Sequence, residues 1–286
     1  MLKCRVTKTK ISIVRYLNAA PLAWGILEGQ QAADFETVLS TPAECADQLS
    51  AGTVDIGLIP SIEFQRIKGS RIIPGPVIAC RHRVRSVLLI SNKPLWEVKT
   101  VASDSSSRTS VVLARILLDE FNHVRPEFRT TEPNLETMLA QADAAVIIGD
   151  PALKFMEANE QPNAEKQKVL LKLSPEPLFV FDMVERWKVL TGLPFVFAFW
   201  ASRTGFQNGN ATDLLKASRD FGVANTTTIA ERYAQTLSIR KEYLQEYLDQ
   251  NVSYFMDSEC AEGLQLFYEK AAHIGAIPSP RRLEFL

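Results

Sequence analysis

A run of small hydroxyl residues stands between an apolar stretch and an amphipathic stretch in "VASDSSSRTSVVLARIL", residues 101–117. Four hydroxyls fall within five positions, at Ser105, Ser106, Ser107 and Thr109. We expect a strand to end and a helix to begin here, and a helix N-terminus suits a carboxylate or phosphate because its first N–H groups are unpaired. A single Ser or Thr would suffice as a helix cap, so the excess of hydroxyls favours anion binding.

Two further strand ends carry polar or small residues. Asn18 lies in the turn of "RYLNAAPL", where an asparagine is ordinary because it caps helices and tolerates left-handed backbone, although it could also face a ligand. In "GDPAL", Gly149 would allow the backbone to approach a ligand closely. Asp150 in the same stretch either caps the following helix or acts as a catalytic carboxylate.

Other candidates stand near these turns. Ser86 opens the apolar stretch "SVLLIS", directly after the basic run "RHRVR". Such a run usually forms a solvated surface, but Arg85 or His82 could lie near the mouth of a cleft. Arg108 either adds a positive charge to the hydroxyl run or lies in solvent. Glu63, beside the strand "IGLIP", is a weak candidate.

Several common catalytic patterns are absent from the sequence. It contains no G-x-S-x-G, P-loop, G-x-G-x-x-G or H-E-x-x-H motif. We therefore expect no metal site, no nucleotide site and no cofactor. His123 and His273 fall at predicted helix ends and are expected to be structural, and Asp55 is expected to belong to the scaffold.

The elements that must position these residues alternate between strands and helices. "ISIVRY" predicts a strand, and "TPAECADQLSAG" predicts a helix with Thr41 as its cap and Glu44 three residues later. A strand is expected at 54–59. This rhythm indicates an α/β fold with a parallel sheet and crossover helices.

The alternation resumes after about residue 92 and divides the chain into two similar lobes. Residues 56–63 and 147–154 look like equivalent strand ends, and ligands bind beyond the carboxyl ends of such strands, so a cleft is expected between the lobes. The predicted lobes are residues 1–92 with 195–286, and residues 93–194. Amphipathic helices are expected near 211–222, 227–236, 240–251 and 258–273.

Composition excludes several classes of protein. The 286 residues are 46% hydrophobic with a net charge of −1, and no basic block suggests a nucleic-acid partner. No run of about 18 apolar residues predicts a membrane span. The four scattered cysteines, Cys4, Cys45, Cys80 and Cys260, are expected to be reduced and mostly buried. The basic N-terminus lacks the apolar stretch of a secretion signal, so we expect a cytoplasmic protein.

Five stretches together resemble the chorismate dehydratases of the futalosine route to menaquinone: "IVRYLNAAPL", "GTVDIGLIPSIEF", "SSSRTSVVLARILL", "AAVIIGDPAL" and "TGLPFVFAFWASR". Each is weakly specific, but their order is that of the family. The stretch "FDMVERW" departs from the family pattern, outside the candidate site. The resemblance implies a two-lobed fold like the type II periplasmic solute-binding proteins, with a ligand cleft between the lobes.

The resemblance also implies a reaction and a set of site residues. It implies conversion of chorismate to 3-[(1-carboxyvinyl)oxy]benzoate with loss of water and without a cofactor. Asn18 and Ser86 would be catalytic. The residues expected to bind the small dicarboxylate substrate are Ser106, Ser107, Thr109, Gly149 and Asp150. The alternatives are the sister dihydroxynaphthoate synthase, for which "RYLNAAP" would read more like "SPCPND", and a non-catalytic protein that binds a small carboxylate.

The base of such a reaction is left open. Asn18 cannot act as a base near neutral pH, and the hydroxyl of Ser86 would need activation. Glu63 and Asp150 are the titratable candidates within the motifs. The enolpyruvyl carboxylate of the substrate itself is the other hypothesis.

Overall fold

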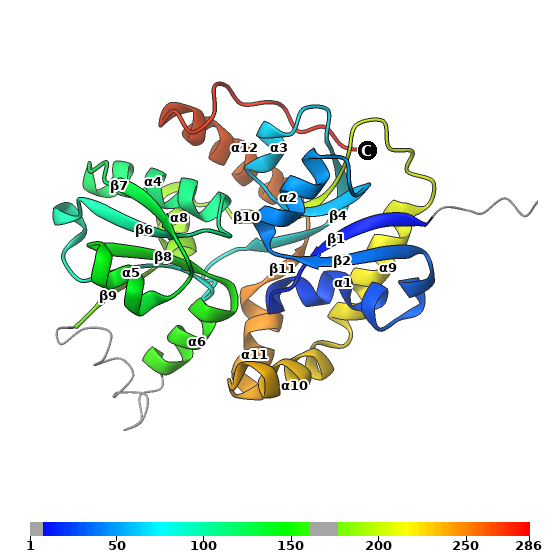
Figure 1. The fold of residues 1–286 in the computed structure, drawn as a ribbon, viewed down its shortest axis with the longest axis horizontal. Coiled ribbons are helices and arrows are strands. Elements are labelled where there is room, and N and C mark those ends of the chain that lie inside the picture. The colour runs from blue at the N-terminus through cyan, green and yellow to red at the C-terminus, as the bar shows by residue number, and fades with distance from the viewer. Residues whose placement is uncertain (1–7, 161–176) are drawn as a thin grey trace, which may run out of the picture.

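The computed structural model describes residues 8–160 and 177–286, which form two lobes, each built on one β-sheet (Figure 1). The first sheet contains, in spatial order, β11 (Ser253–Phe255), β4 (Arg71–Cys80), β10 (Phe195–Ser202), β3 (Ile56–Pro60), β1 (Thr9–Val14) and β2 (Phe35–Ser40). The second contains β7 (Glu127–Thr131), β6 (Thr100–Asp104), β8 (Ala144–Ile148), β5 (Val87–Ser91) and β9 (Phe179–Asp182).

The two sheets repeat one arrangement of strands. In the first, β1 pairs in parallel with β2 and β3, and β10 runs antiparallel beside β3. In the second, β6 pairs in parallel with β7 and β8, and β5 runs antiparallel beside β8. The strands β3 and β8 therefore occupy equivalent places, as the similarity of residues 56–63 and 147–154 predicts.

Two details correct the sequence-based expectation. The sheets are mixed rather than parallel, because β5 and β10 each enter from the other lobe and run against the parallel strands. The strand β5, which the predicted division at residue 93 assigns to the first lobe, pairs with β8 and β9 in the second sheet. We therefore propose residues 81–86 and 192–194 as the two connections between the lobes.

Helices cover both sheets. Those before the second connection are α1 (Ala20–Leu27), α2 (Pro42–Ser50), α3 (Glu63–Arg66), α4 (Thr109–Asn122), α5 (Leu135–Gln141), α6 (Gly149–Glu160) and α8 (Met183–Thr191). Short 3₁₀ turns are η1 (Leu17–Ala19), η2 (Gln30–Ala33) and η3 (Leu95–Glu97). The predicted capping box of α2 is present: Thr41 Oγ1 accepts from the N–H of Glu44 at 3.3 Å, and Glu44 Oε2 accepts from the N–H of Thr41 at 2.6 Å.

From residue 211 onward the chain is mainly helical, as predicted. It forms α9 (Ala211–Val223), α10 (Thr226–Leu237), α11 (Lys241–Glu246), the π-helical turn η4 (Tyr247–Asn251) and α12 (Ser258–His273). Helix α12 contacts β10 of the first lobe and α4 of the second. Helix α12 therefore joins the two lobes in addition to the two proposed chain connections (Figure 1).

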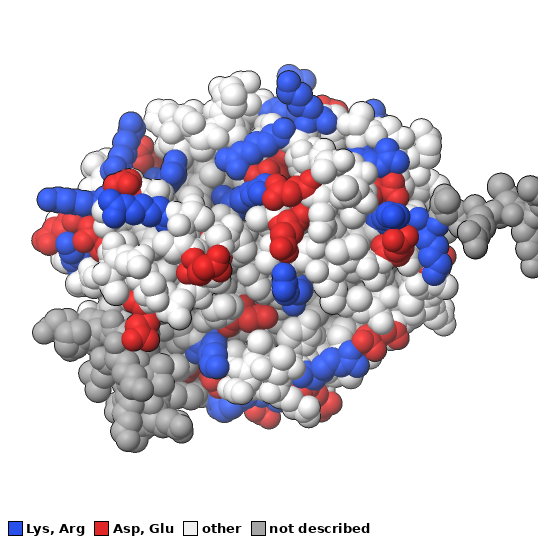
Figure 2. Space-filling model, in the orientation of Figure 1, with Lys and Arg blue, Asp and Glu red and all other residues white. Residues whose placement is uncertain are grey.

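The cysteines, the surface charges and the helix lengths follow the expectations from composition. Cys45, Cys80 and Cys260 are free and buried, and burial raises the pKa of the Cys45 and Cys80 thiols to about 12; Cys4 lies outside the described residues. Acidic and basic side chains are interspersed over the face shown in Figure 2. In the described part of the chain, no helix is long and apolar enough to cross a membrane.

Candidate active site

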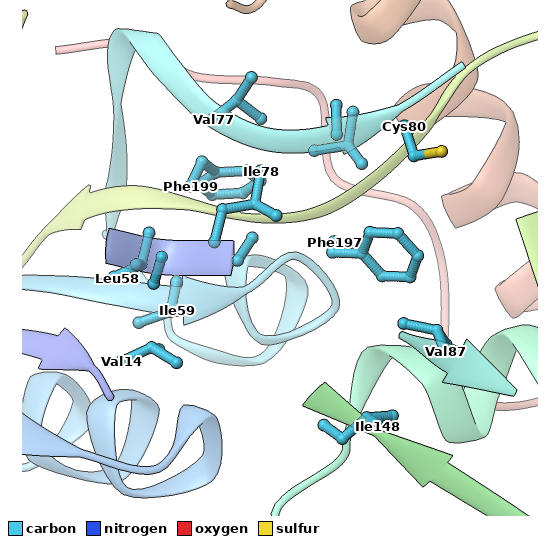
Figure 3. Close-up of a cluster of buried hydrophobic side chains, with 14 of the residues drawn as sticks. Val14, Leu58, Ile59, Val77, Ile78, Cys80, Val87, Ile148, Phe197 and Phe199 are labelled. Atoms are coloured by element: carbon cyan, nitrogen blue, oxygen red, sulfur yellow. The ribbon is translucent and has the colours of Figure 1, made fainter. Parts of the chain in front are cut away.

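A cavity lies where the strand ends of the two lobes face each other. Its apolar wall comes from Val14, Pro42, Pro60, Ile78, Val87, Ile148, Phe197 and Ala198, and its polar wall from Tyr16, Asn18, Ser106, Ser107, Arg108, Thr109, Ser110 and Gly149. Figure 3 shows Val87 and Ile148 of the second sheet across from Val14, Ile78 and Phe197 of the first. The cavity thus offers apolar surfaces beside one polar end.

The polar end is built on the N-terminus of α4. The N-cap residue, Arg108, makes no side-chain capping bond, and the first backbone bond of the helix runs from the N–H of Val112 to the carbonyl of Arg108. The N–H groups of residues 109–111 therefore precede the helical ladder and remain available to an anion. Ser107 lies at the same place, only 7% exposed, and its Oγ has no partner among the described residues.

Ser106 is engaged in a different way. Its Oγ donates to Asp104 Oδ1 at 2.7 Å, so the bond of 3.0 Å between Ser106 Oγ and the Tyr16 hydroxyl has Tyr16 as the donor. Burial raises the pKa of the Asp104 carboxyl, which is 1% exposed. The side chain of Ser106 therefore links Tyr16 of the first lobe to the second lobe, whereas the buried hydroxyl of Ser107 has no partner among the described residues.

Thr109 also bridges the lobes. Its Oγ1 accepts a hydrogen bond of 3.2 Å from the N–H of Ile62 and lies 3.4 Å from Ser61 Oγ. The Ser61 segment is itself fixed, because Ser61 Oγ donates to the carbonyl of Val196 and the Tyr268 hydroxyl donates to the carbonyl of Ser61. The start of α4 is thereby held against a hydrogen-bonded segment of the first lobe.

The turn that carries Asn18 contacts the end of β8. Asn18 lines the cavity, and its buried Oδ1 has no partner among the described residues. The N–H of Leu17 donates to Asp150 Oδ1 at 3.0 Å. Gly149 has φ of +66°, and a Cβ at this position would lie 2.8 Å from Tyr16 Cδ2. The close approach at Gly149 is thus made to the Tyr16 ring of the opposite lobe.

Ser86 lies behind the cavity wall. It is 1% exposed, and its Oγ is 2.7 Å from the Tyr247 hydroxyl. Its carbonyl accepts from the N–H of Gly149 at 2.8 Å. Burial raises the pKa of Tyr247 far above its usual range, so the phenol stays protonated at neutral pH. Ser86 therefore reaches the site through Gly149 and through its neighbour Val87, which lines the cavity.

The remaining charged candidates are paired. Glu63, 4% exposed, accepts from Arg66 at 2.7 Å and from Arg108 at 3.1 Å. Arg108 also donates to both oxygens of Asp47, at 2.7 and 2.8 Å, so it joins the lobes by ion pairs. Asp55 bonds Arg203 at 2.8 Å, as expected of a scaffold residue.

The basic run after β4, residues 81–85, lies away from the cavity between the lobes. Arg85 donates to Glu246 Oε1 at 2.7 Å and lies over the ring of Tyr243. His82 is exposed and borders a separate pocket beside Tyr254 and Phe255. Neither Arg85 nor His82 belongs to the described lining of the cavity between the lobes.

The structure brings most of the predicted residues to one place. Asn18, Ser106, Ser107, Thr109 and Gly149 line the cavity. Ser86 contacts one of these residues, Gly149, whereas Asp150 accepts from Leu17, which directly precedes Asn18 and is not part of the described lining.

Sequence reasoning missed Tyr16 and Phe197. The ring of Tyr16 could have been suspected from its place in the same turn as Asn18. Phe197 gave no signal beyond a buried strand. The described residues contain no group of three or more His, Cys, Asp or Glu side chains that could hold a metal ion.

The sequence of this chain matches a known protein family. The family model for menaquinone biosynthesis matches residues 9–273, and with them both lobes and the whole cavity. The chain belongs to the menaquinone biosynthesis family. It is 32% identical over 267 residues to the chorismate dehydratase of Thermus thermophilus, covering 91% of this chain and 93% of that one. It is 26% identical over 258 residues to the chorismate dehydratase of Campylobacter jejuni, covering 89% and 93%.

Solved structures confirm the predicted two-lobed fold. A crystal structure of a protein from Archaeoglobus fulgidus superimposes with a TM-score of 0.72 at 14% identity, covering 96% of this chain and 100% of that one. The periplasmic aliphatic sulphonate binding protein of Escherichia coli gives a TM-score of 0.60 at 14% identity, covering 98% and 94%. This member of the menaquinone biosynthesis family therefore has the fold of periplasmic solute-binding proteins.

Proposed function

We propose that the protein is a chorismate dehydratase, a carbon–oxygen lyase that converts chorismate to 3-[(1-carboxyvinyl)oxy]benzoate and water. The observation that carries this proposal is the polar end of the cavity, which lies beside apolar walls. An uncapped helix N-terminus and the free Ser107 hydroxyl face the same space as the Asn18 amide. This arrangement suits a small ring that bears carboxylates, and the family and the named relatives agree with it.

The α4 N-terminus is the proposed seat of a substrate carboxylate. The N–H groups of residues 109–111 and the Ser107 hydroxyl would donate to it, and charge-assisted bonds of this kind are the stronger ones. Arg108 would support the seat only from a distance, because its guanidinium is already bonded to Asp47 and Glu63. The anion would thus be recognised by directed hydrogen bonds rather than by an adjacent free cation.

The apolar walls would hold the ring. Phe197 and Ile78 from the first lobe and Val87 and Ile148 from the second enclose the cavity. Orientation between two such walls reduces the freedom of the substrate before reaction. The described lining contains no His, Cys or carboxylate side chain.

The reaction removes a proton from the ring carbon that bears the ether and breaks the C–O bond of the neighbouring ring alcohol. The electron pair of the C–H bond forms the last ring double bond, and the hydroxyl leaves with a proton as water. The Asn18 side-chain NH₂ is the proposed donor to the charge that develops.

The proposed base is a group of the substrate rather than of the protein. Glu63 is held by two arginines, and Asp150 accepts from the N–H of Leu17. The described lining of the cavity contains neither a carboxylate nor a histidine. These contacts support the hypothesis that the enolpyruvyl carboxylate of the substrate takes the proton.

The deciding experiment is incubation of the purified protein with chorismate, followed by chromatography and mass spectrometry. We expect a single product lighter than chorismate by one water. Chorismate that binds in calorimetry but is recovered unchanged would instead support a non-catalytic carboxylate-binding protein. We further propose that the enzyme works in the cytoplasm, which cell fractionation tests.

A further inference from the structure

The turn that presents Asn18 lacks a cap of its own. It is the 3₁₀ turn η1, whose N-cap residue Tyr16 makes no side-chain capping bond. Its first N–H, that of Leu17, instead donates to Asp150 Oδ1 at 3.0 Å. Asp150 belongs to the other lobe, in the first turn of α6, and none of the described N–H groups of α6 donates to it. The cap of this turn is therefore supplied from across the cavity.

The neighbouring residues make a second contact at the same place. The ring of Tyr16 packs on Gly149 so closely that a Cβ there would lie 2.8–3.0 Å from three ring atoms. The Tyr16 hydroxyl is bonded at 3.0 Å to Ser106 of the second lobe. Tyr16 and Leu17, the two residues directly before Asn18, are thus both in contact with the second lobe.

We propose that Asp150 is a positioning residue that caps the Asn18 turn when the lobes are closed and so fixes the Asn18 amide against the substrate. The proposal rests on the proposed function. Asp150 would touch neither the substrate nor the reacting atoms. Closure of the lobes and alignment of the amide would be one event, since a single bond joins the second lobe to the N–H that directly precedes Asn18.

The charge of Asp150 makes this role measurable. Burial raises its pKa to about 6, and the bond from Leu17 lowers it. Among the described residues, the titratable groups that face it are three tyrosines: Tyr16 beside η1, Tyr233 on α10 and Tyr247 in η4. The pKa values of all three are raised, so they stay neutral near pH 6. An ionised carboxylate accepts from an N–H more strongly than a neutral carboxyl, so the cap should strengthen as the pH rises through about 6.

The bond itself is tested without substrate. In ¹⁵N-labelled protein, the amide resonance of Leu17 should titrate with a midpoint near pH 6, and the Asn18 side-chain NH₂ resonances should follow it. Both titrations should disappear in Asp150→Asn. The matched control is Asp213→Asn, the same change at an exposed carboxyl of α9. Site-specific resonances are needed because burial also raises the pKa of Asp182 to about 6, and Asp182 would affect any whole-protein pH profile.

Kinetics then test the positioning role. Asp150→Ala, which removes the acceptor, should lower kcat about tenfold or more and change KM less. Asp150→Asn keeps an acceptor oxygen, so it should recover most of kcat, and its rise of kcat near pH 6 should be smaller than that of the wild type. Equal kcat values for the Asn and Ala variants would overturn the role of Asp150. A Leu17 amide resonance whose pH titration is the same in both variants as in the wild type would overturn it as well. Failure of the wild type to turn over chorismate overturns the proposed function instead, whatever the Leu17 resonance shows.

Discussion

The N–H of Ile62 in the first lobe donates a hydrogen bond of 3.2 Å to the hydroxyl of Thr109, the first residue of α4 in the second lobe. Thr109, one of the five residues expected from the sequence to bind substrate, is therefore already engaged between the lobes. Its hydroxyl holds the helix N-terminus in place, and the first two residues of the helix, Thr109 and Ser110, line the cavity.

Replacement of Thr109 by valine should weaken chorismate binding about tenfold. The variant keeps the shape of the side chain but leaves the buried N–H of Ile62 unpaired in the closed form, at a cost of roughly 1–3 kcal/mol. Titration calorimetry measures the change, and Thr109→Ser serves as the control because it retains the acceptor. Unchanged affinity in Thr109→Val would show that this bond does not contribute to the bound state.

Asn18→Ala should leave the fold intact and lower turnover of chorismate by about a hundredfold or more, because donors to developing charge contribute on this scale. Circular dichroism and steady-state kinetics check the two parts of the prediction. Asn92→Ala, at an exposed turn, is the matched control. A folded Asn18→Ala variant with near-normal turnover would return Asn18 to the role of an ordinary turn residue.

Gly149→Ala should be more harmful than an alanine at another glycine of the same backbone conformation. Both Gly149 and Gly205 have positive φ, +66° and +74°, but a Cβ at Gly205 meets nothing within 4 Å. Gly205→Ala therefore carries only the backbone strain of roughly 1–2 kcal/mol. Gly149→Ala adds a collision with Tyr16, so it should lower both Tm and kcat further. Equal losses in the two variants would mean that the Tyr16 contact relaxes freely.

Glu63→Gln should change kcat by less than about tenfold, well below the 10²–10⁴ typical of losing a general base. The Glu63 carboxylate is occupied by Arg66 and Arg108, so it should not take a proton from the substrate. Steady-state kinetics at pH 7 to 8 measure the effect. A loss of a thousandfold with normal folding would reinstate Glu63 as the base.

A chorismate analogue whose enolpyruvyl carboxylate is a neutral amide should bind but not lose water. This outcome follows if that carboxylate is the base, since the described lining of the cavity contains no other carboxylate. Calorimetry must first show that the analogue binds competitively with chorismate. Dehydration of the bound amide at a normal rate would direct the search to protein groups.

Asp150→Asn should change the pH dependence of stability. The folded pKa of Asp150 is raised to about 6, whereas an unfolded Asp titrates near 4. Between these values the folded chain retains a proton that the unfolded chain has released, so this group's contribution to stability falls as the pH rises from about 4 to 6. Urea unfolding at pH 4.5 and pH 7 should therefore show that the free energy of unfolding of Asp150→Asn, relative to that of the wild type, is higher at pH 7 than at pH 4.5. A constant difference between the two proteins would contradict the raised pKa.

Local patterns in the sequence were enough for the elements and for part of the site. The capping box at Thr41 and Glu44, the repeat at 56–63 and 147–154, and the periodic C-terminal stretches each depend on residues close in sequence. The hydroxyl run at the start of α4 was likewise visible. Such signals predict where a helix begins and what its N-terminus offers, because capping is decided within one turn.

Long-range pairing decided the rest. Nothing near Ser106 indicates that it accepts from Tyr16, a residue 90 positions away, or that Asp150 caps Leu17 from 133 positions away. The assignment of β5 to the second sheet also depends on its pairing with β8 and β9. The chain alone thus determined the α/β elements, their repeat and the hydroxyl-rich helix start. Only the packing of one lobe against the other decided which of these groups remain free, because each buried polar group takes whichever partner folding brings within reach.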